Sequence, residues 1–462
     1  MENQIDTKRK ELLFGNISRH RQLTLNACQY IWENPETGFR EWKAHRYLWD
    51  AFTALGYSPV AAGNIPGFYA DIDTGRPGPT VLVFGELDAL LVEGHPDADP
   101  ETGAVHACGH CCQAAALLGL AAALKEPGSL EGLCGKIRLT AVPAEELIEI
   151  EYREQLRRDG IIHYYGGKPE FMYRGMLDGA DVAMMCHSAS IPSHVGAIRG
   201  GGNGFITKQI TYMGRSSHAG GAPHAGVNAL YAANQGLNSI NALRETFRDN
   251  AHIRVHPIIT KGGTAVNAIP DCVTMECYVR GASMEAIRSA NQKVNRALAA
   301  SAAALGAEVM LQDRPGYSPR SRSLAFLELA RDAMESFLVK TSYGPDTWSG
   351  GSTDLGDVSC VMPVIHPLIG GVVGGAHGVD YRIADPEAAC LDIVRFHMLA
   401  LELLLRNDAR RCYSIMEDYQ PPFTGIGEYL AYTNGFILDR NAVRYDGHGN
   451  VLLNLGTEEK TI

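Results

Sequence analysis

The string HACGHCC, residues 106–112, carries the most unusual arrangement of reactive side chains in this sequence. Cys108 and His110 lie two residues apart, just before an alanine- and leucine-rich stretch that predicts a helix. A turn there can point a thiolate and an imidazole at a common centre, and both groups bind transition metals. The alternative is a buried thiol beside a helix-capping histidine. A zinc ribbon on Cys108 and Cys111 is excluded, because no second CxxC pair has suitable spacing.

Glu145 and Glu146 follow KIRLTAV, an apolar stretch that predicts a buried strand. Adjacent carboxylates usually lie on a solvated surface. At the end of a buried strand, however, neighbouring side chains diverge. One carboxylate can then bind a metal ion while the other faces the water on that ion as a general base.

Two further histidines occupy positions where ligands are expected. His187 ends the predicted strand DVAMMCH, and His377 lies in the glycine-rich loop GGAHGVD. Either one alone is more often a structural residue. Ligands bind outside the carboxyl ends of strands in open α/β sheets, so these positions converge on one rim. The resulting set suffices for one or two divalent transition-metal ions: Cys108, His110, Glu146, His187 and His377.

Asp88 in GELDAL also ends a predicted strand, and Glu86 precedes it by two residues on the same side. Carboxylates at such positions commonly orient a metal-bound histidine. The alternative for Asp88 is a simple cap at the end of the strand.

A later segment carries polar residues without an obvious partner. His218 and His224 precede a predicted helix, and Asn267 and Arg280 lie near predicted strand ends. On their own, most such residues are surface residues. They become candidates only if this segment closes over the metal site.

The helices and strands expected around these residues indicate an α/β protein. Between about residues 22 and 187, helices alternate with strands such as PTVLVFGEL and KIRLTAV, which indicates a mainly parallel sheet. From Gly204 to about Val309 the order becomes β-α-β-β-α-β, the ferredoxin-like split unit. We therefore expect a discontinuous first domain, residues 1–198 and 312–462, and an inserted domain, residues 199–311. The tail from Asn407 contains a hairpin-like stretch and no recognisable chemistry.

Composition limits the classes of partner. The 462 residues are 45% hydrophobic, and their net charge of −11 comes with no cluster of basic residues, which argues against nucleic acid. No apolar run reaches the roughly 20 residues of a membrane span, and the N-terminus has no secretory signal. Eleven cysteines without an export signal predict reduced thiols in a cytoplasmic protein.

The order of the motifs resembles metallopeptidase family 20 over about residues 20–406. That family includes aminoacylases, carboxypeptidase G-type enzymes, indoleacetyl-amino-acid hydrolases and aminobenzoyl-glutamate hydrolase. The cysteine in HACGH resembles the amidohydrolase branch, where it takes the place of a bridging aspartate. The motifs that carry the resemblance are GELDAL, HACGHCC, AVPAEE, MMCHSA, GRSSHAG, NAIPDCVTMECYVR and GGAHGVD.

The resemblance implies a role for each candidate residue. Glu145 would be the general base, Asp88 would support a ligand, and the metal would be manganese or zinc. The inserted domain would be a lid and dimerisation domain of a homodimer or larger homo-oligomer. His218 would reach a neighbouring subunit's site and stabilise the oxyanion. The substrate-binding residues would be Asn267, His224 and Arg280, with Arg280 gripping a carboxylate of a small-molecule substrate.

Three departures from the family pattern surround the site. Glu86 stands where the amidohydrolase branch usually has Asp, and Cys111 stands where that branch usually has Asp or Asn. Residues 147–165, LIEIEYREQLRRDGIIHYY, form a longer and more aromatic segment than usual. These departures bear on which substrate is bound and on how many metal ions are held. They do not alter the expectation of a metal-dependent hydrolase.

We therefore expect a metal-dependent hydrolase of a small C–N bond, an amidohydrolase of N-acyl or N-aroyl amino acids or small dipeptides. Glu145 would take a proton from water activated by the metal and pass it to the leaving amine. The alternative, to which the family resemblance extends, is an aminohydrolase that releases ammonia from an aromatic amine such as 5-nitroanthranilate. The aromatic segment 147–165 and the altered HACGHCC and GELDAL contexts would suit a pocket reshaped for it. An inactive binding or scaffold protein is disfavoured, because Glu145 and all five ligands are present.

Overall fold

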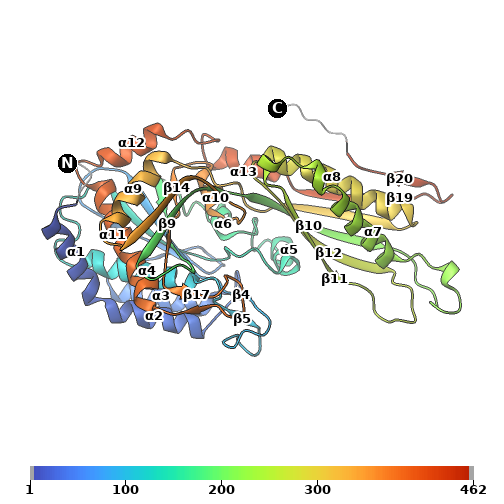
Figure 1. Ribbon diagram of the computed structural model, residues 1–462, viewed down its shortest axis with the longest axis horizontal. Coiled ribbons are helices and arrows are strands. Elements are labelled where there is room, and N and C mark those ends of the chain that lie inside the picture. Colours follow the sequence, from blue (N-terminus) through green and yellow to red (C-terminus); the bar gives the residue numbers. More distant parts are fainter. Residues whose placement is uncertain (1–4, 457–462) are drawn as a thin grey trace. The chain divides into compact units, whose positions relative to one another are not determined.

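The computed structural model describes residues 5–456 and divides them into two compact units (Figure 1). The first unit runs to Gly201 and then takes in Arg320–Ser349 and Thr353–Tyr429. The second contains Gly202–Pro319, Gly350–Ser352 and the chain from Leu430 on. The main segment of this second unit, residues 202–319, compares with the inserted domain expected at residues 199–311. The expected first domain also includes residues 1–4 and 457–462, which lie outside the described residues.

The first unit contains a six-stranded sheet in the order β1-β2-β6-β3-β7-β15. Strand β3 pairs in parallel with β6 and β7, and β15 pairs in parallel with β7, whereas β1, β2 and β6 pair antiparallel. Strands β3, β7 and β15 are buried along nearly their whole length, as expected of strands covered on both faces. The strands are β1 (Val60–Ala61), β2 (Phe68–Asp73), β3 (Thr80–Glu86), β6 (Lys136–Val142), β7 (Val182–Met184) and β15 (Val364–Ile365).

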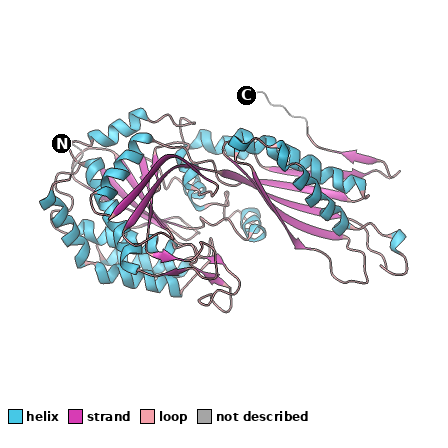
Figure 2. Cartoon of the chain, viewed as in Figure 1, coloured by secondary structure: helices cyan, strands magenta, loops and turns pink. Residues whose placement is uncertain are grey.

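Helices enclose this sheet (Figure 2). Helix α4 packs on β3 and is apolar all round, so fifteen of its sixteen residues are buried. The helices of this unit are α1 (Thr7–Arg19), α2 (Arg21–Glu33), α3 (Trp42–Ala54), α4 (His110–Lys125), α5 (Ile150–Arg158), α6 (Gly167–Tyr173), α9 (Leu324–Glu335), α10 (Leu355–Ser359), the π-helix η4 (Glu387–Leu391), α11 (Asp392–Leu405) and α12 (Arg410–Asp418). Helix α13 (Ile426–Asn434) spans the boundary between the units.

A second sheet of the first unit corrects one expectation about His187. The strand expected through His187 stops at Met184, and His187 begins a separate short strand, β8 (His187–Ser188), in a four-stranded sheet. The backbone N–H of His187 donates to the carbonyl oxygen of Pro367. This pairing takes the chain at His187 out of the first sheet. The other strands are β14 (Lys340–Ser349), β9 (Val195–Gly202) and β16 (Leu368–Ile369). Two short pairs are β4 (Leu90–Leu91) with β5 (Ala104–Val105), and β17 (Val372–Val373) with β18 (Arg382–Ile383).

The second unit has the expected β-α-β-β-α-β order, with the strands in spatial order β11-β12-β10-β13. Helices α7 and α8 pack on one face of this antiparallel sheet and close an apolar core (Figure 1). Its elements are β10 (Gly204–Met213), α7 (Ala229–Ala242), β11 (Arg254–Lys261), β12 (Cys272–Gly281), α8 (Met284–Ala304) and β13 (Glu308–Pro315), with short 3-10 turns at Pro223–Ala225, Arg244–Thr246 and Asp249–Ala251.

The tail extends this second sheet. Strand β19 (Leu438–Tyr445) pairs antiparallel with β13, and β20 (Val451–Leu453) forms the expected hairpin with β19. Residues 430–456 therefore belong to the second unit, which corrects their assignment to the catalytic domain. The reason is a long-range pairing: β19 covers an edge of β13 that would otherwise expose unpaired backbone groups.

The predicted fold class is confirmed: an α/β unit with a mainly parallel sheet, together with a ferredoxin-like α+β unit. Strands β3 and β6 run parallel, so both carboxyl ends meet at one edge of the sheet. Asp88 follows β3 by two residues, and Glu145 and Glu146 follow β6 by three and four.

Candidate metal centre and active site

The turn before α4 brings Cys108 and His110 to His187. Their three ligand atoms all lie within 4.8 Å of one another, and the Cys108 Sγ lies 3.3 Å from the His187 Nε2. Gly109 makes this turn with a φ of +94°, and a Cβ there would collide with the hydroxyls of Ser188 and Tyr381. Glycine is therefore required between the two ligands.

Cys108 also belongs to a second group, with Glu146 and His377, whose ligand atoms again lie within 4.8 Å of one another. The His377 Nε2 lies 2.9 Å from the Glu146 Oε1. His377 adopts a φ of +64°, and its backbone N–H donates to the carbonyl of Ala107 at 2.9 Å. The loop that carries His377 is thus tied to the turn that carries Cys108.

This donor set fits metal binding. The two groups share the Cys108 sulfur, which suits two neighbouring ions, and they combine one thiol with imidazoles and a carboxylate. The His110 Nε2 is buried and makes no hydrogen bond within residues 5–456, although the Glu86 Oε2 lies 3.3 Å away. A buried imidazole nitrogen without a hydrogen bond is available as a ligand.

Asp88 connects two of these candidate ligands. One carboxylate oxygen lies 3.1 Å from the His110 Nδ1, and the other accepts the backbone N–H of Glu146 at 2.7 Å. Burial raises the pKa of Asp88, but the charge of His110 and these hydrogen bonds outweigh burial and bring the pKa to about 2. Asp88 is therefore an ionised acceptor that orients His110.

Glu145 is buried beside this group, with its Oε2 4.0 Å from the His110 Nε2. Burial, followed by the charges of Glu86 and Glu146, raises the pKa of Glu145 well above its ordinary value. A carboxylate in such surroundings gains a proton readily, as a general base must.

A buried ion network that the sequence analysis missed lies next to Glu145. The Lys168 Nζ lies 2.5 Å from the Glu86 Oε1 and also contacts Asp354, and all three side chains are fully buried. Carboxylate oxygens of Glu86, Glu145 and Asp354 lie within 4.8 Å of one another. Lys168 therefore offsets the charge of this acidic group. The surrounding sequence, GKPEFMYRG, also contains Glu170 and Arg174, so nothing in it marks Lys168 as buried.

A second missed pair clamps the loop that carries the two glutamates. The Glu41 Oε1 accepts the backbone N–H of Ala144 at 2.7 Å, and the Arg153 guanidinium donates to the carbonyl oxygens of Glu146 and Tyr165. Arg153 is 1% exposed although it comes from the unusual segment 147–165. Ala144 has a φ of +57°, a strained conformation for a residue other than glycine, and these contacts hold it.

The residues predicted in the inserted segment form no such cluster among the described residues. His218 is exposed, and its Nδ1 accepts the backbone N–H groups of Gly220 and Gly221. Asn267 is also exposed. It lies beside His218, because the backbone carbonyl of Asn267 accepts the N–H of Ala219. His218 does not cap the helix that follows it, because Asn228 is the N-cap of α7.

The other two predicted residues of this segment lie apart. Arg280, on β12, donates to the Ser352 hydroxyl at 3.1 Å and lies over the ring of Phe205. His224 is exposed in the short turn Pro223–Ala225.

Comparisons with known proteins agree with this arrangement. A family described as the peptidase dimerisation domain matches residues 201–305. The Xaa-Arg dipeptidase of Homo sapiens is 30% identical over 396 residues, which cover 80% of each chain. The chain belongs to metallopeptidase family 20, the M20 family. The N-acetyl-L-cysteine deacetylase of Bacillus subtilis is 27% identical over 344 residues, 72% of this chain and 76% of that one.

The M20 fold extends over most of the chain. A crystal structure of a dinuclear metal-binding M20 peptidase from Bacillus subtilis matches with a TM-score of 0.61 at 21% identity, over 84% of this chain and 99% of the other. An aminobenzoyl-glutamate utilization protein from Klebsiella pneumoniae matches with a TM-score of 0.63 at 20% identity, over 84% and 98%. This M20 member is a hydrolase of C–N bonds in small molecules, which confirms the predicted enzyme class. Within the described residues, no helix has the length and apolar character that crossing a membrane requires.

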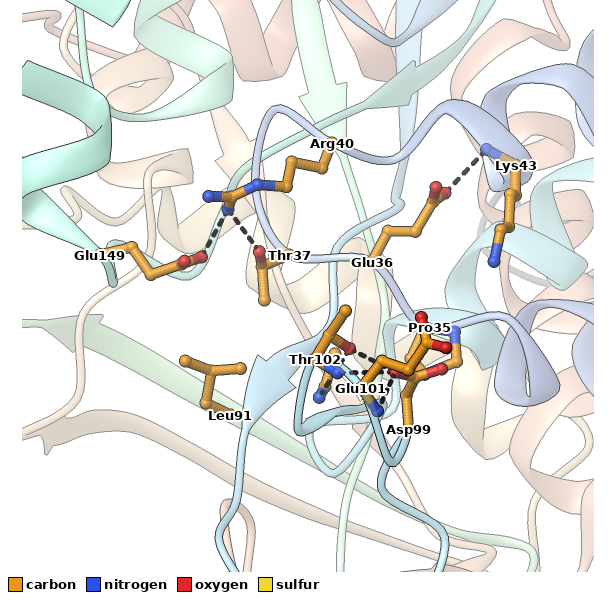
Figure 3. Close-up of a pocket in the computed structure, with 11 residues that line it drawn as sticks. Pro35, Glu36, Thr37, Arg40, Lys43, Leu91, Asp99, Glu101, Thr102 and Glu149 are labelled. Carbon is orange, nitrogen blue, oxygen red and sulfur yellow. Dashed lines mark hydrogen bonds and ion pairs between the residues drawn. The ribbon is translucent and has the colours of Figure 1, made fainter. Parts of the chain in front are cut away.

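Figure 3 shows a polar pocket of about 410 Å³ in the first unit of this M20 enzyme. The Arg40 guanidinium donates to Thr37 and Glu149, at 2.8 Å each, and lies over the ring of Tyr152. None of the predicted site residues lines the pocket. The contacts of Arg40 join the start of the segment 147–165 to the loop at Thr37. Thr37 in turn forms a β-bridge with Ala89, the residue after Asp88.

Proposed function

We propose that this enzyme hydrolyses the amide bond of N-acyl or N-aroyl amino acids, or of small dipeptides, with one or two divalent ions, Mn²⁺ or Zn²⁺. The observation that carries the proposal is the Cys108 sulfur shared between two ligand groups beside the buried Glu145. The proposed ligands are Cys108, His110, Glu146, His187 and His377.

The candidate residues of the first unit have distinct tasks in this proposal. Bound ions would supply Lewis-acid polarisation of the scissile carbonyl and acidify water. Glu145 accepts the proton of the attacking water at its carboxylate and returns it to the nitrogen of the leaving amine. Asp88 holds the His110 ring and the Glu146 backbone in place, because its two oxygens contact both.

The second unit completes the site in this proposal. His218 of a neighbouring subunit stabilises the oxyanion of the tetrahedral intermediate, Arg280 grips a substrate carboxylate, and Asn267 and His224 bind the rest of the substrate. The match to a peptidase dimerisation domain over residues 201–305 supports a homodimer or larger homo-oligomer. The exposure of His218 and Asn267 supports a role toward another subunit.

The names of relatives support an amide or peptide bond as the target. They include a dipeptidase, an N-acetyl-L-cysteine deacetylase and an indole-3-acetyl-aspartic acid hydrolase. Free thiols at all eleven cysteines support a reducing compartment, the cytoplasm.

One of the observations behind the aromatic-amine alternative is weakened by the structure. The aromatic segment 147–165 was expected, together with the altered HACGHCC and GELDAL contexts, to suit a reshaped pocket. Tyr164 and Tyr165 are 7% and 3% exposed, and the Tyr165 hydroxyl donates to Glu154 of the same segment. These rings are packed inside the protein, and the segment serves instead to hold Arg153 under the glutamate loop.

A substrate panel with Mn²⁺ or Zn²⁺ tests the proposal, with free amino acid and ammonia assayed separately. We expect amino acid release from N-acyl or N-aroyl amino acids or dipeptides, and none from the Glu145→Gln protein. Ammonia release from an aminobenzoate without an amino acid product would replace the proposal with the aminohydrolase. No turnover by fully metal-loaded enzyme on any of these substrates would reject both.

A further inference from the structure

Four thiols meet in the core of the first unit, apart from the ligands proposed above. Cys28 comes from α2, Cys111 and Cys112 from the first turn of α4, and Cys390 from the π-helix η4. Helices α2 and α4 pack side by side (Figure 1), and η4 contacts both of them. All four side chains are at most 3% exposed, so three separate elements each bring sulfur to one buried place.

The spacing of three of the sulfurs is close to that of a metal–thiolate site. The Cys28 and Cys112 sulfurs are 3.9 Å apart, and those of Cys28, Cys111 and Cys112 all lie within 4.8 Å of one another. The Cys390 thiol interacts with those of Cys28 and Cys112 but lies outside this group of three. Tetrahedral zinc with Zn–S bonds of about 2.3 Å separates its sulfurs by about 3.8 Å. Three of the thiols are therefore near the required spacing, and Cys390 must move closer to complete a tetrahedron.

Several features around the four sulfurs argue against a purely apolar packing role. Cys111 and Cys112 occupy the start of the sixteen-residue helix α4, where the helix dipole favours negative charge. His106 is 1% exposed, interacts electrostatically with Cys28, and neither of its ring nitrogens has a hydrogen-bond partner within residues 5–456. A buried polar ring without a partner needs an explanation, and an anionic thiolate cluster would accept its N–H. Cys390 lies in a π-helix, an irregularity that often marks functional positions.

We infer that Cys28, Cys111, Cys112 and Cys390 form a second, structural site for a thiophilic tetrahedral cation of the Zn²⁺ class. On binding, the sulfurs release their protons to solvent and form four metal–sulfur bonds, so metal uptake and proton release are coupled. The ion joins α2 and η4 to the turn of α4 that carries His110. It thereby stabilises the platform of the proposed catalytic centre and takes no part in the reaction.

The metal content of the full-length chain tests this inference independently of activity. The Cys108→Ala/His187→Ala/His377→Ala protein, in which both proposed catalytic ligand groups lose at least two members, is loaded with Zn²⁺ under reducing conditions and desalted. We expect it to retain one zinc per chain by elemental analysis. Adding Cys28→Ala and Cys390→Ala should abolish that zinc, whereas adding Cys134→Ala and Cys412→Ala, which are also buried free thiols of this unit, should not.

Zinc X-ray absorption of the unaltered, fully loaded protein is the second measurement and needs no variant. We expect a sulfur shell at about 2.3 Å, with more sulfur per zinc than the single thiolate Cys108 supplies. Retention of no zinc by Cys108→Ala/His187→Ala/His377→Ala, or a shell with only one sulfur among all ions, would overturn the inference. A disulfide between these cysteines in the reduced, zinc-loaded protein, detected by mass spectrometry, would overturn it as well.

Discussion

The Asp88 carboxylate and the Glu146 backbone N–H form a 2.7 Å hydrogen bond that joins the ends of two parallel strands. The other oxygen of Asp88 contacts His110 at 3.1 Å, so one ionised side chain sets both a histidine and a carboxylate of the proposed ligand set. Because the two oxygens of one carboxylate are rigidly linked, movement of either ligand is opposed by the other.

Glu145→Gln should retain the bound metal and lose turnover by roughly 10²–10⁴-fold or more, because an amide cannot accept the proton of water. Metal content and kcat measured on the same preparation check this. Glu151→Gln is the control, since Glu151 is exposed on α5. A metal-loaded Glu145→Gln protein with normal kcat would place the general base elsewhere.

Cys108→Ser should lower the affinity for metal, because a hydroxyl is a far poorer ligand than a thiolate. Both ligand groups contain Cys108, so we expect the loss to affect both ions. Elemental analysis after dialysis measures it, with Cys412→Ser as the matched buried thiol. Unchanged stoichiometry in Cys108→Ser would remove this residue from the ligand set.

Arg153→Ala should destabilise the protein by about 1–3 kcal/mol for each buried carbonyl left without a donor. It should also lower kcat more than it raises KM, because the glutamate loop loses its support while the substrate-binding residues are untouched. Urea unfolding and steady-state kinetics measure the two effects. Arg157→Ala, one turn along the same helix and only partly buried, should change neither. Wild-type stability of Arg153→Ala would contradict this account of the segment 147–165.

Mixing two inactive variants tests whether His218 acts across subunits. In a dimer of one His218→Ala and one Glu145→Gln subunit, a trans arrangement leaves one site intact, so activity should return after subunit exchange. In a cis arrangement each site lacks one group, and the mixture stays inactive. Mixing either variant with itself is the control.

His397 should contribute to acid denaturation. Burial in α11 lowers the pKa of His397 to about 3, whereas the unfolded chain binds this proton near pH 6.5. The contribution to stability is therefore complete above about pH 6.5 and is lost as pH falls toward about 3, at up to about 1.4 kcal/mol per pH unit.

His397→Leu removes this proton uptake and should flatten the fall in unfolding free energy between about pH 6.5 and pH 4.5 relative to the unaltered protein. Urea unfolding at both pH values measures the difference. Identical pH dependence of the two proteins would show that His397 is already protonated, or accessible to protons, in the folded state.

Local patterns determined much of this protein. KIRLTAV became β6 at its expected residues, and the apolar run after Cys111 became α4. Such elements are recognisable because strand and helix periodicities act over a few residues. The five proposed ligands, Asp88 and Glu145 could be named for the same reason: each stands in a short motif at the end of a strand or in a tight turn.

Only the tertiary structure decided which distant residues meet. His187 begins a strand of a different sheet, and β19 joins β13 across more than a hundred residues. The sequence does not reveal the roles of Arg153 and Lys168. Lys168 is buried against Asp354, which lies far along the chain, and Arg153 donates to the carbonyl of Glu146 in the glutamate loop. The thiols from α2, α4 and η4 likewise converge only after three helices pack. Local sequence specifies what an element is, but packing specifies its neighbours, because long-range contacts depend on the shapes of all elements together.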